Sequence, residues 1–250
     1  MRIDTDGLII REKVVGESDR LVTVLTRGEG VVRAFARQAK NLKNAKASST
    51  QLLCYSHLTL YKGKDKYIID DAQPLEVFFG LRKDIARLSL AQYFCELAGA
   101  LAPEDSDAGD FLRLMLNALH FLANGSRPEK LLKPVVEMRM LSMAGYMPDL
   151  VCCAGCSAYE KDPMYFLPDK GTLLCGDCGG AEGYGVRLSP GALTALRHTV
   201  YAEFGKLFSF QLSSGGLDQL CQASEAFLLQ QLGRPFKTLD FYHSCAGETG

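Results

Sequence analysis

The spacing of hydrophobic and polar residues along the chain changes near residue 78. Before it, short β-branched or alternating runs predict five strands, at Gly7–Val15, Arg20–Thr26, Val31–Arg37, Leu52–Tyr61 and Lys66–Ala72. Polar and glycine-rich turns such as Gly28-Glu29-Gly30 separate these runs. Five short strands with no helix between the first three predict a small closed barrel, an OB-fold, and an SH3-like barrel is the chief alternative.

From about residue 79 the apolar positions recur with the helical period of 3.6 residues. We expect helices over Leu81–Leu101, Phe111–Leu122, Leu131–Met143 and Leu217–Leu232. Pro128 suits the first turn of the third of these, and Ser189-Pro190 predicts the start of a further helix that runs to about Ala202. The fold class is therefore α+β: an OB-fold domain at 1–78, then a helical domain at 79–250 that carries an insertion at 151–185.

The insertion is rich in cysteine and glycine and lacks helical periodicity, so another device must hold it together. Two C-x-x-C pairs supply one, and their members are Cys153, Cys156, Cys175 and Cys178. Two such turns that face each other are typical of a closed, structural Zn²⁺ site. An iron centre, a redox pair and incidental cysteines are the alternatives, and Cys152 competes in register with Cys153.

A net charge of −1 conceals a basic beginning and an acidic remainder. Residues 1–66 hold 13 Lys and Arg against 7 Asp and Glu, and no carboxylate occurs between Glu29 and Asp65. Within that stretch Arg33, Phe35 and Arg37 alternate onto one face of the third strand. Two cations beside a ring suit single-stranded nucleic acid, because the cations neutralise phosphates and the ring stacks on a base. Further candidate contacts lie in the polar segment 38–50, which we expect to be a mobile loop: Lys40, Lys43 and Lys46.

Motifs for catalysis are missing from the sequence. There is no G-x-x-x-x-G-K-[ST] loop for a nucleotide, and no histidine lies in an H-x-E pattern of the kind that base deaminases need. We also find no convergent carboxylates for a two-metal nuclease. We therefore expect a protein that is not an enzyme and binds no nucleotide. No stretch approaches 18 uninterrupted apolar residues and the first residues do not form a secretory signal, so we also expect no membrane span and a cytoplasmic location. A DNA-binding protein would there be associated with the nucleoid.

Several short segments, in order along nearly the whole chain, resemble the RecO family of bacterial recombination mediators. They are Gly7–Arg11, Gly16–Leu21, Leu25–Gly30, Ala34–Arg37, Leu60-Tyr61, Ala144–Pro148, Leu188–Gly191 and Gly233–Phe241. The resemblance implies an OB-fold, a helical domain and a zinc-ribbon-like insertion whose ligands are Cys153, Cys156, Cys175 and Cys178. It also implies contact of DNA with the basic strand and loop, through Arg33, Arg37, Lys40, Lys43 and Lys46.

The same resemblance implies binding and annealing of single- and double-stranded DNA. It implies cooperation with RecR and single-strand-binding protein in loading a recombinase. A rival hypothesis is a zinc-stabilised adaptor that binds proteins only, with its basic loop serving solubility.

Overall fold

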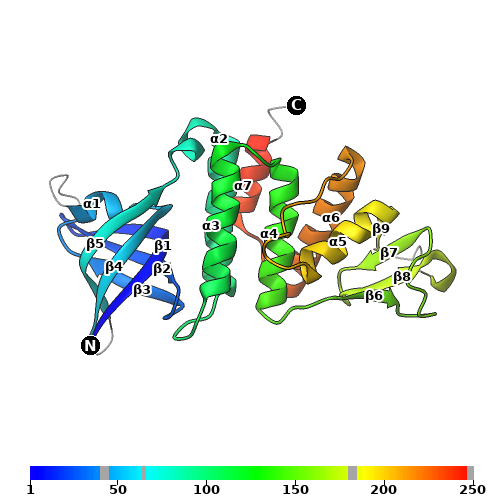
Figure 1. Ribbon diagram of the computed structural model, residues 1–250, viewed down its shortest axis with the longest axis horizontal. Helices are drawn as coiled ribbons and strands as arrows, with labels where there is room; N and C mark the ends of the chain where they lie inside the picture. The colour runs from blue at the N-terminus through cyan, green and yellow to red at the C-terminus, as the bar shows by residue number, and fades with distance from the viewer. Residues whose placement is uncertain (40–44, 64–65, 180–184, 247–250) are drawn as a thin grey trace. The chain divides into compact units, whose positions relative to one another are not determined.

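The computed structural model describes residues 1–39, 45–63, 66–179 and 185–246 of the chain. It forms two compact units, Met1–Gly125 with Phe236–Gly250, and Ser126–Pro235 (Figure 1). The change from strands to helices falls at residue 78, where we expected a domain boundary. The compact units divide elsewhere, because helices that follow the barrel pack with it.

Five strands of the first unit close into a barrel in the order β1-β2-β3-β5-β4. Their bounds are β1 Arg2–Val15, β2 Asp19–Thr26, β3 Val31–Ala36, β4 Cys54–Lys62 and β5 Tyr67–Val77. β3 and β5 run parallel and the other neighbouring pairs run antiparallel. This is the OB-fold topology, so the structure decides against the SH3-like alternative. Alternate residues such as Val22, Val24, Ala34, Leu58 and Ile69 point inward and form the buried core.

Part of the segment expected to be a loop is a short helix, α1 (Ala45–Ser49), between β3 and β4. Its C-terminal residues are buried against the barrel. Ser49 donates a hydrogen bond to the Ala72 carbonyl of β5, and Arg20 of β2 donates one to the carbonyl of Ala47. The expectation of a mobile loop over 38–50 was therefore wrong for this part, because side chains that look polar in sequence hydrogen-bond to the barrel.

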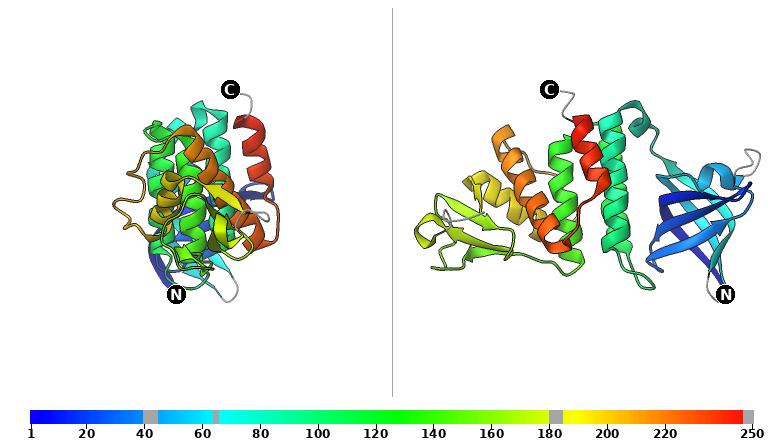
Figure 2. Two further views of the ribbon diagram at one scale, coloured as in Figure 1. Left: turned by 90° about the vertical axis from the view of Figure 1, so that its right-hand side faces the viewer. Right: turned by 180° about the vertical axis from the view of Figure 1, so that it is seen from behind.

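Three helices complete the first unit: α2 (Ile85–Leu101), α3 (Gly109–Asn124) and α7 (Lys237–Ala246). The predicted helix from Leu81 is broken, since the 3-10 turn η1 (Phe79–Lys83) precedes Asp84, which caps α2 through its side chain. Figure 2 shows α7, in red, beside α2. The ring of Phe236, just before α7, meets that of Tyr93 on α2 edge to face. Helix α7 was not predicted from periodicity.

The segment between α2 and α3 packs closely against the backbone of the barrel. Val31 donates its N–H to the Pro103 carbonyl at 2.8 Å. Gly30 has a φ of +67°, and a Cβ there would lie 2.1 Å from the same carbonyl oxygen. A glycine is required at this position by both its conformation and the close approach.

The second unit combines helices with a small sheet. Its helices are α4 (Glu129–Met143), α5 (Pro190–Tyr201) and α6 (Ser214–Leu232). Its strands, in the sheet order β6-β8-β7-β9, are β6 (Asp149–Cys153), β8 (Thr172–Cys175), β7 (Met164–Leu167) and β9 (Val186–Leu188). The 3-10 turn η2 (Gly176–Cys178) follows β8. The insertion expected at 151–185 thus forms most of this sheet. Among the described residues, no helix combines the length and the apolar character that crossing a bilayer requires.

Candidate nucleic-acid interface and metal centre

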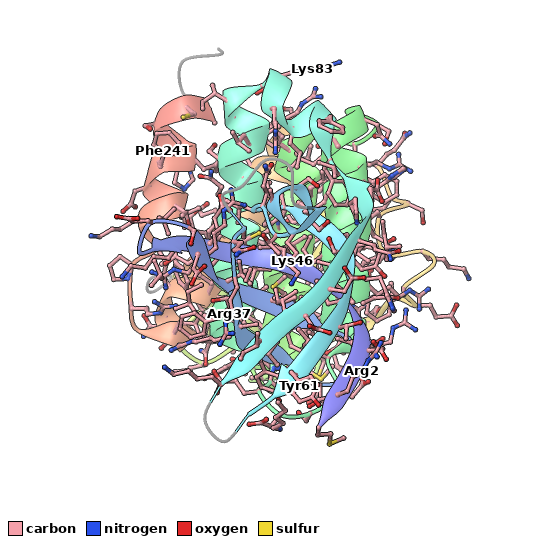
Figure 3. The ribbon with its side chains drawn as sticks, turned by 90° about the vertical axis from the view of Figure 1, so that its left-hand side faces the viewer. Arg2, Arg37, Lys46, Tyr61, Lys83 and Phe241 are labelled. Carbon is pink, nitrogen blue, oxygen red and sulfur yellow. The ribbon has the colours of Figure 1, made fainter. Side chains whose placement is uncertain are left out.

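The outer face of β3 carries the cation–ring–cation pattern that the sequence predicts. Arg33 and Arg37 are exposed and Phe35 is half-buried, whereas Val32, Ala34 and Ala36 between them are buried. The side chains of Arg33 and Arg37 have no ion-pair or hydrogen-bond partner within the described part of the chain. Arg37 lies one residue beyond the end of the strand, on the side of the barrel that Figure 3 shows.

One further basic candidate, Lys46, lies among the described residues. Lys46 belongs to α1, is half-buried, and donates from Nζ to the Ile69 carbonyl at 3.3 Å. Its ammonium is therefore partly held by the barrel. Lys40 and Lys43 lie outside the described residues.

Strand register reveals two neighbouring rows of outward residues that sequence reasoning did not assemble. Register pairs Phe35 with Leu21 on β2 and with Ile68 on β5, and all three side chains are half-buried. One step away, register pairs Arg33 with Thr23, and Thr23 with the exposed Arg11 of β1. Rows two residues apart lie about 7 Å from each other.

Lys66 is a functional candidate that the sequence analysis missed, because the basic stretch was ended at Asp65. It is exposed and precedes β5, and its Nζ lies 5.2 Å from the centroid of the Phe35 ring. A cation–π contact at an exposed site contributes about 0.5–1 kcal/mol, less than the 1–3 kcal/mol of a stacked base. A base can therefore compete with Lys66 for the ring.

Carboxylates border the same face. Asp70 is exposed on β5, next along the strand from Ile69, which pairs with Ala36. Farther round the barrel, Asp4 accepts a hydrogen bond from Thr59 at 2.6 Å. Negative charge therefore limits the extent of the basic face around β3.

The second candidate site is the cysteine cluster. The Sγ atoms of Cys153, Cys156, Cys175 and Cys178 all lie within 4.8 Å of one another. Cys153 ends β6 and Cys175 ends β8, so the parallel pairing of these strands brings the two C-x-x-C turns together. Cys152 is not in the cluster: it is half-buried, whereas Cys153 is fully buried.

The cluster's geometry suits a tetrahedral metal. Four sulfur atoms bound to Zn²⁺ at about 2.3 Å stand about 3.8 Å apart, and the Sγ atoms of Cys156 and Cys175 are 3.8 Å apart. A Cβ on Gly155 would lie 2.9 Å from the Cys178 Sγ, so the first turn also needs a glycine beside the sulfurs. These residues could hold a metal ion.

The electrostatics of the cluster also favour a cation. Burial opposes ionisation of the Cys153 thiol, but the backbone N–H groups of Cys175, Cys156 and Gly155 outweigh it and lower the pKa of Cys153 to about 6. Hydrogen bonding with the side chains of Cys175, Cys156 and Cys153 raises the pKa of Cys178 to about 12. Four thiolates therefore need a bound cation to share the site.

Arg197 of α5 anchors the β6–β9 sheet, which carries the cysteine cluster, within the second unit. Its guanidinium is buried and donates to the carbonyls of Leu150, Val151 and Tyr159 at 2.7, 3.1 and 2.7 Å. It also lies 4.0 Å from the centroid of the Tyr159 ring. A single side chain thus ties β6 and the segment after the first cysteine turn to the helices.

Comparisons with known proteins cover both units. Residues 1–78 match the family model described as "Recombination protein O N terminal", and residues 82–240 match "Recombination protein O C terminal". A "DNA repair protein RecO" from Acetivibrio thermocellus is 34% identical over 96% of this chain and 95% of its own length. Proteins of the same name from Symbiobacterium thermophilum and Dehalococcoides mccartyi (strain CBDB1) are 32% and 29% identical, over 95% and 94% of both chains.

Proposed function

Because this chain belongs to the recombination protein O (RecO) family, we propose that it is a recombination mediator that binds and anneals DNA strands without catalysing a reaction. Membership of the family supports a role in DNA repair and recombination. The contacts and partners that follow go further than family membership and make up our proposal.

One observation carries the DNA-binding part: Arg33 and Arg37 are exposed on either side of Phe35, and neither side chain has a partner among the residues that the structure describes. Exposed cations that form no internal ion pair are available to phosphates. The neutralisation of phosphates releases counterions and supplies most of the affinity of sequence-independent binding. The half-buried ring between them offers a base a flat apolar face.

The two outward rows divide these tasks between them. Arg11, Arg33 and Lys66 would contact the sugar-phosphate chain, and Leu21, Phe35 and Ile68 would lie under the bases. Lys40, Lys43 and Lys46 stay in the proposal as further phosphate contacts from the segment after β3, with residues 1–78 as the DNA-binding part. Neutralisation of phosphates and stacking of bases do not require nucleotide hydrolysis. Such a surface would therefore hold and pair strands without it.

We propose a structural Zn²⁺ on Cys153, Cys156, Cys175 and Cys178. The support is the mutual approach of the four sulfurs and their closed, all-thiolate composition. A tetrathiolate site supplies no open coordination position, so the ion would order the β6–β9 element rather than take part in a reaction. Such binding contributes about 10–16 kcal/mol of apparent folding free energy in zinc-finger peptides.

The partners proposed from the family are RecR and single-strand-binding protein. With them the protein would load a recombinase on single-stranded DNA, in the cytoplasm and in association with the nucleoid. No residue is assigned to either partner.

The proposal is tested with the Arg33→Glu/Arg37→Glu double variant. Affinity for a labelled single-stranded oligonucleotide, and the rate at which complementary oligonucleotides anneal, should both fall at least tenfold. The matched control is Lys206→Glu, which reverses an exposed charge in the second unit and should leave both quantities unchanged. Equal binding and annealing by the double variant and wild type would refute the proposal.

The same variant distinguishes the adaptor hypothesis. A protein that only bridges other proteins would keep its repair activity after charge reversal at Arg33 and Arg37. A mediator that binds DNA through β3 would lose its repair activity in this variant.

A further inference from the structure

We infer that Tyr61 is a second base-stacking ring, and that a DNA strand crosses β5 between Phe35 and Tyr61. This inference rests on the proposed function and names the path of the strand over the barrel. Tyr61 lies on β4, two strands away from Phe35 in the closed sheet.

Strand register supplies the first step. Phe35 of β3 pairs with Ile68 of β5, and Ile68 pairs with Tyr61 of β4. The three residues therefore form one continuous row across three neighbouring strands. With strands about 4.8 Å apart, the two rings stand about 10 Å from each other, with an apolar side chain between them.

Exposure supplies the second step. Tyr61 is 54% exposed, and its side chain has no hydrogen-bond partner or ring contact among the described residues. An aromatic ring presented to solvent beside a basic surface is the arrangement that sequence-tolerant stacking uses. Figure 3 shows Tyr61 and Arg37 on the same side of the barrel.

One cation lies directly beside this row. Lys66 precedes β5, and its Nζ lies 5.2 Å from the centroid of the Phe35 ring. Lys62 follows Tyr61 on β4 but points away from it: its Nζ lies 5.2 Å from the centroid of the Tyr67 ring and 3.5 Å from Asp105. Lys66 is therefore the phosphate contact that we propose beside this row.

The opposite direction from Phe35 offers no ring. There the row continues to Leu21 of β2 and then to Lys13 of β1. Beyond Tyr61 the row ends at Arg2, which pairs with it across β1 and β4. The second ring of this row therefore lies on the β4 side of Phe35.

The test compares Tyr61→Ala with Phe35→Ala and with Tyr146→Ala. Tyr146 is an exposed tyrosine in the second unit and serves as the matched control. Loss of one stacked base should weaken binding of an oligothymidylate about 5- to 140-fold, equivalent to 1–3 kcal/mol. We expect this loss in Tyr61→Ala and Phe35→Ala, no loss in Tyr146→Ala, and recovery in Tyr61→Phe.

An oligonucleotide of the same length made entirely of abasic sites separates stacking from charge. With this probe, wild type and Tyr61→Ala should bind equally, because no base remains to stack. Normal oligothymidylate binding by Tyr61→Ala, together with weakened binding by Phe35→Ala, would overturn the inference and leave the proposed function intact. If wild type itself fails to bind the oligothymidylate, the proposed function fails first and the inference falls with it.

Discussion

A buried charge network in the second unit shows how single residues set its stability. Lys133 of α4 lies 2.8 Å from Glu137 on the same helix and 2.7 Å from Glu225 of α6. Ser224 donates a further hydrogen bond to Glu137 at 2.6 Å. Lys133 and Glu137 are almost completely buried, so each depends on its partners to compensate for lost hydration.

Lys133→Met should therefore destabilise the protein by about 3–5 kcal/mol, because it leaves buried carboxylates without their cation. Lys130→Met is the matched control: it removes another lysine of α4 that pairs with α6, through Asp218 at 2.8 Å, but both partners are largely exposed. That change should cost at most about 1 kcal/mol. Urea unfolding measures both, and equal costs would contradict the role given to burial.

The pH dependence of this network follows from the Lys133 ammonium. Burial lowers the pKa of Lys133, but Glu137 and Glu225 outweigh it and raise the pKa above the ordinary 10.5. Stability from a raised pKa is fully present below 10.5 and is lost as pH rises through the folded-state value. The difference in unfolding free energy between wild type and Lys133→Met should shrink as the pH rises from about 9 through 10.5 and above, where the ammonium loses its proton. A difference that stays constant over that range would show that another group is responsible.

At the scale of elements, the small sheet of the second unit depends on two devices. The cysteine cluster joins the ends of β6 and β8, and Arg197 joins β6 to α5. The first device lies wholly within the element, and the second connects it to the helices. Loss of the Arg197 contacts should therefore leave the cysteine cluster able to bind its metal.

Cys175→Ser should abolish stoichiometric metal binding and expose the β6–β9 element to proteolysis. Cys152→Ser should retain one zinc per chain, because Cys152 stands outside the sulfur cluster. Elemental analysis of the purified proteins measures this directly. Metal loss in Cys152→Ser, or retention in Cys175→Ser, would show that the ligand set is wrong.

Arg197→Ala should keep the metal but loosen the element. The buried guanidinium donates to three backbone carbonyls, and its loss should cost about 2–5 kcal/mol. Faster proteolysis within residues 154–162, with unchanged zinc content, is the expected result. The control is Arg187→Ala on β9, where the arginine is exposed; similar proteolysis of both variants would argue against an anchoring role.

Across the whole molecule, local pattern predicted much of the architecture. Alternation along β3 correctly predicted which of Val32, Arg33, Ala34 and Phe35 face outward, and the C-x-x-C spacing picked out the four cysteines that cluster. The prediction of a closed barrel also followed from the five strands that the sequence indicated. The choice of OB-fold over SH3-like topology needed the parallel pairing of β3 with β5, which no local pattern encodes.

The features that sequence reasoning missed depend on contacts between distant segments. Helix α1 forms where Ser49 meets β5, 23 residues away. The packing of α7 on α2 joins Phe236 to Tyr93, which periodicity within α7 does not reveal. Likewise Lys66 became a candidate only once register placed the start of β5 beside Phe35.

The most direct test of DNA binding through β3 is the salt dependence of single-stranded DNA affinity, in wild type and in Arg33→Gln/Arg37→Gln. If about four phosphates are neutralised, log K should fall with log salt at a slope near −3, and the double variant should reduce the slope to about −1.5. Such a change would place two phosphate contacts on these arginines. A slope that is the same in both proteins, or a wild-type affinity that salt does not alter, would contradict DNA binding through the outer face of β3.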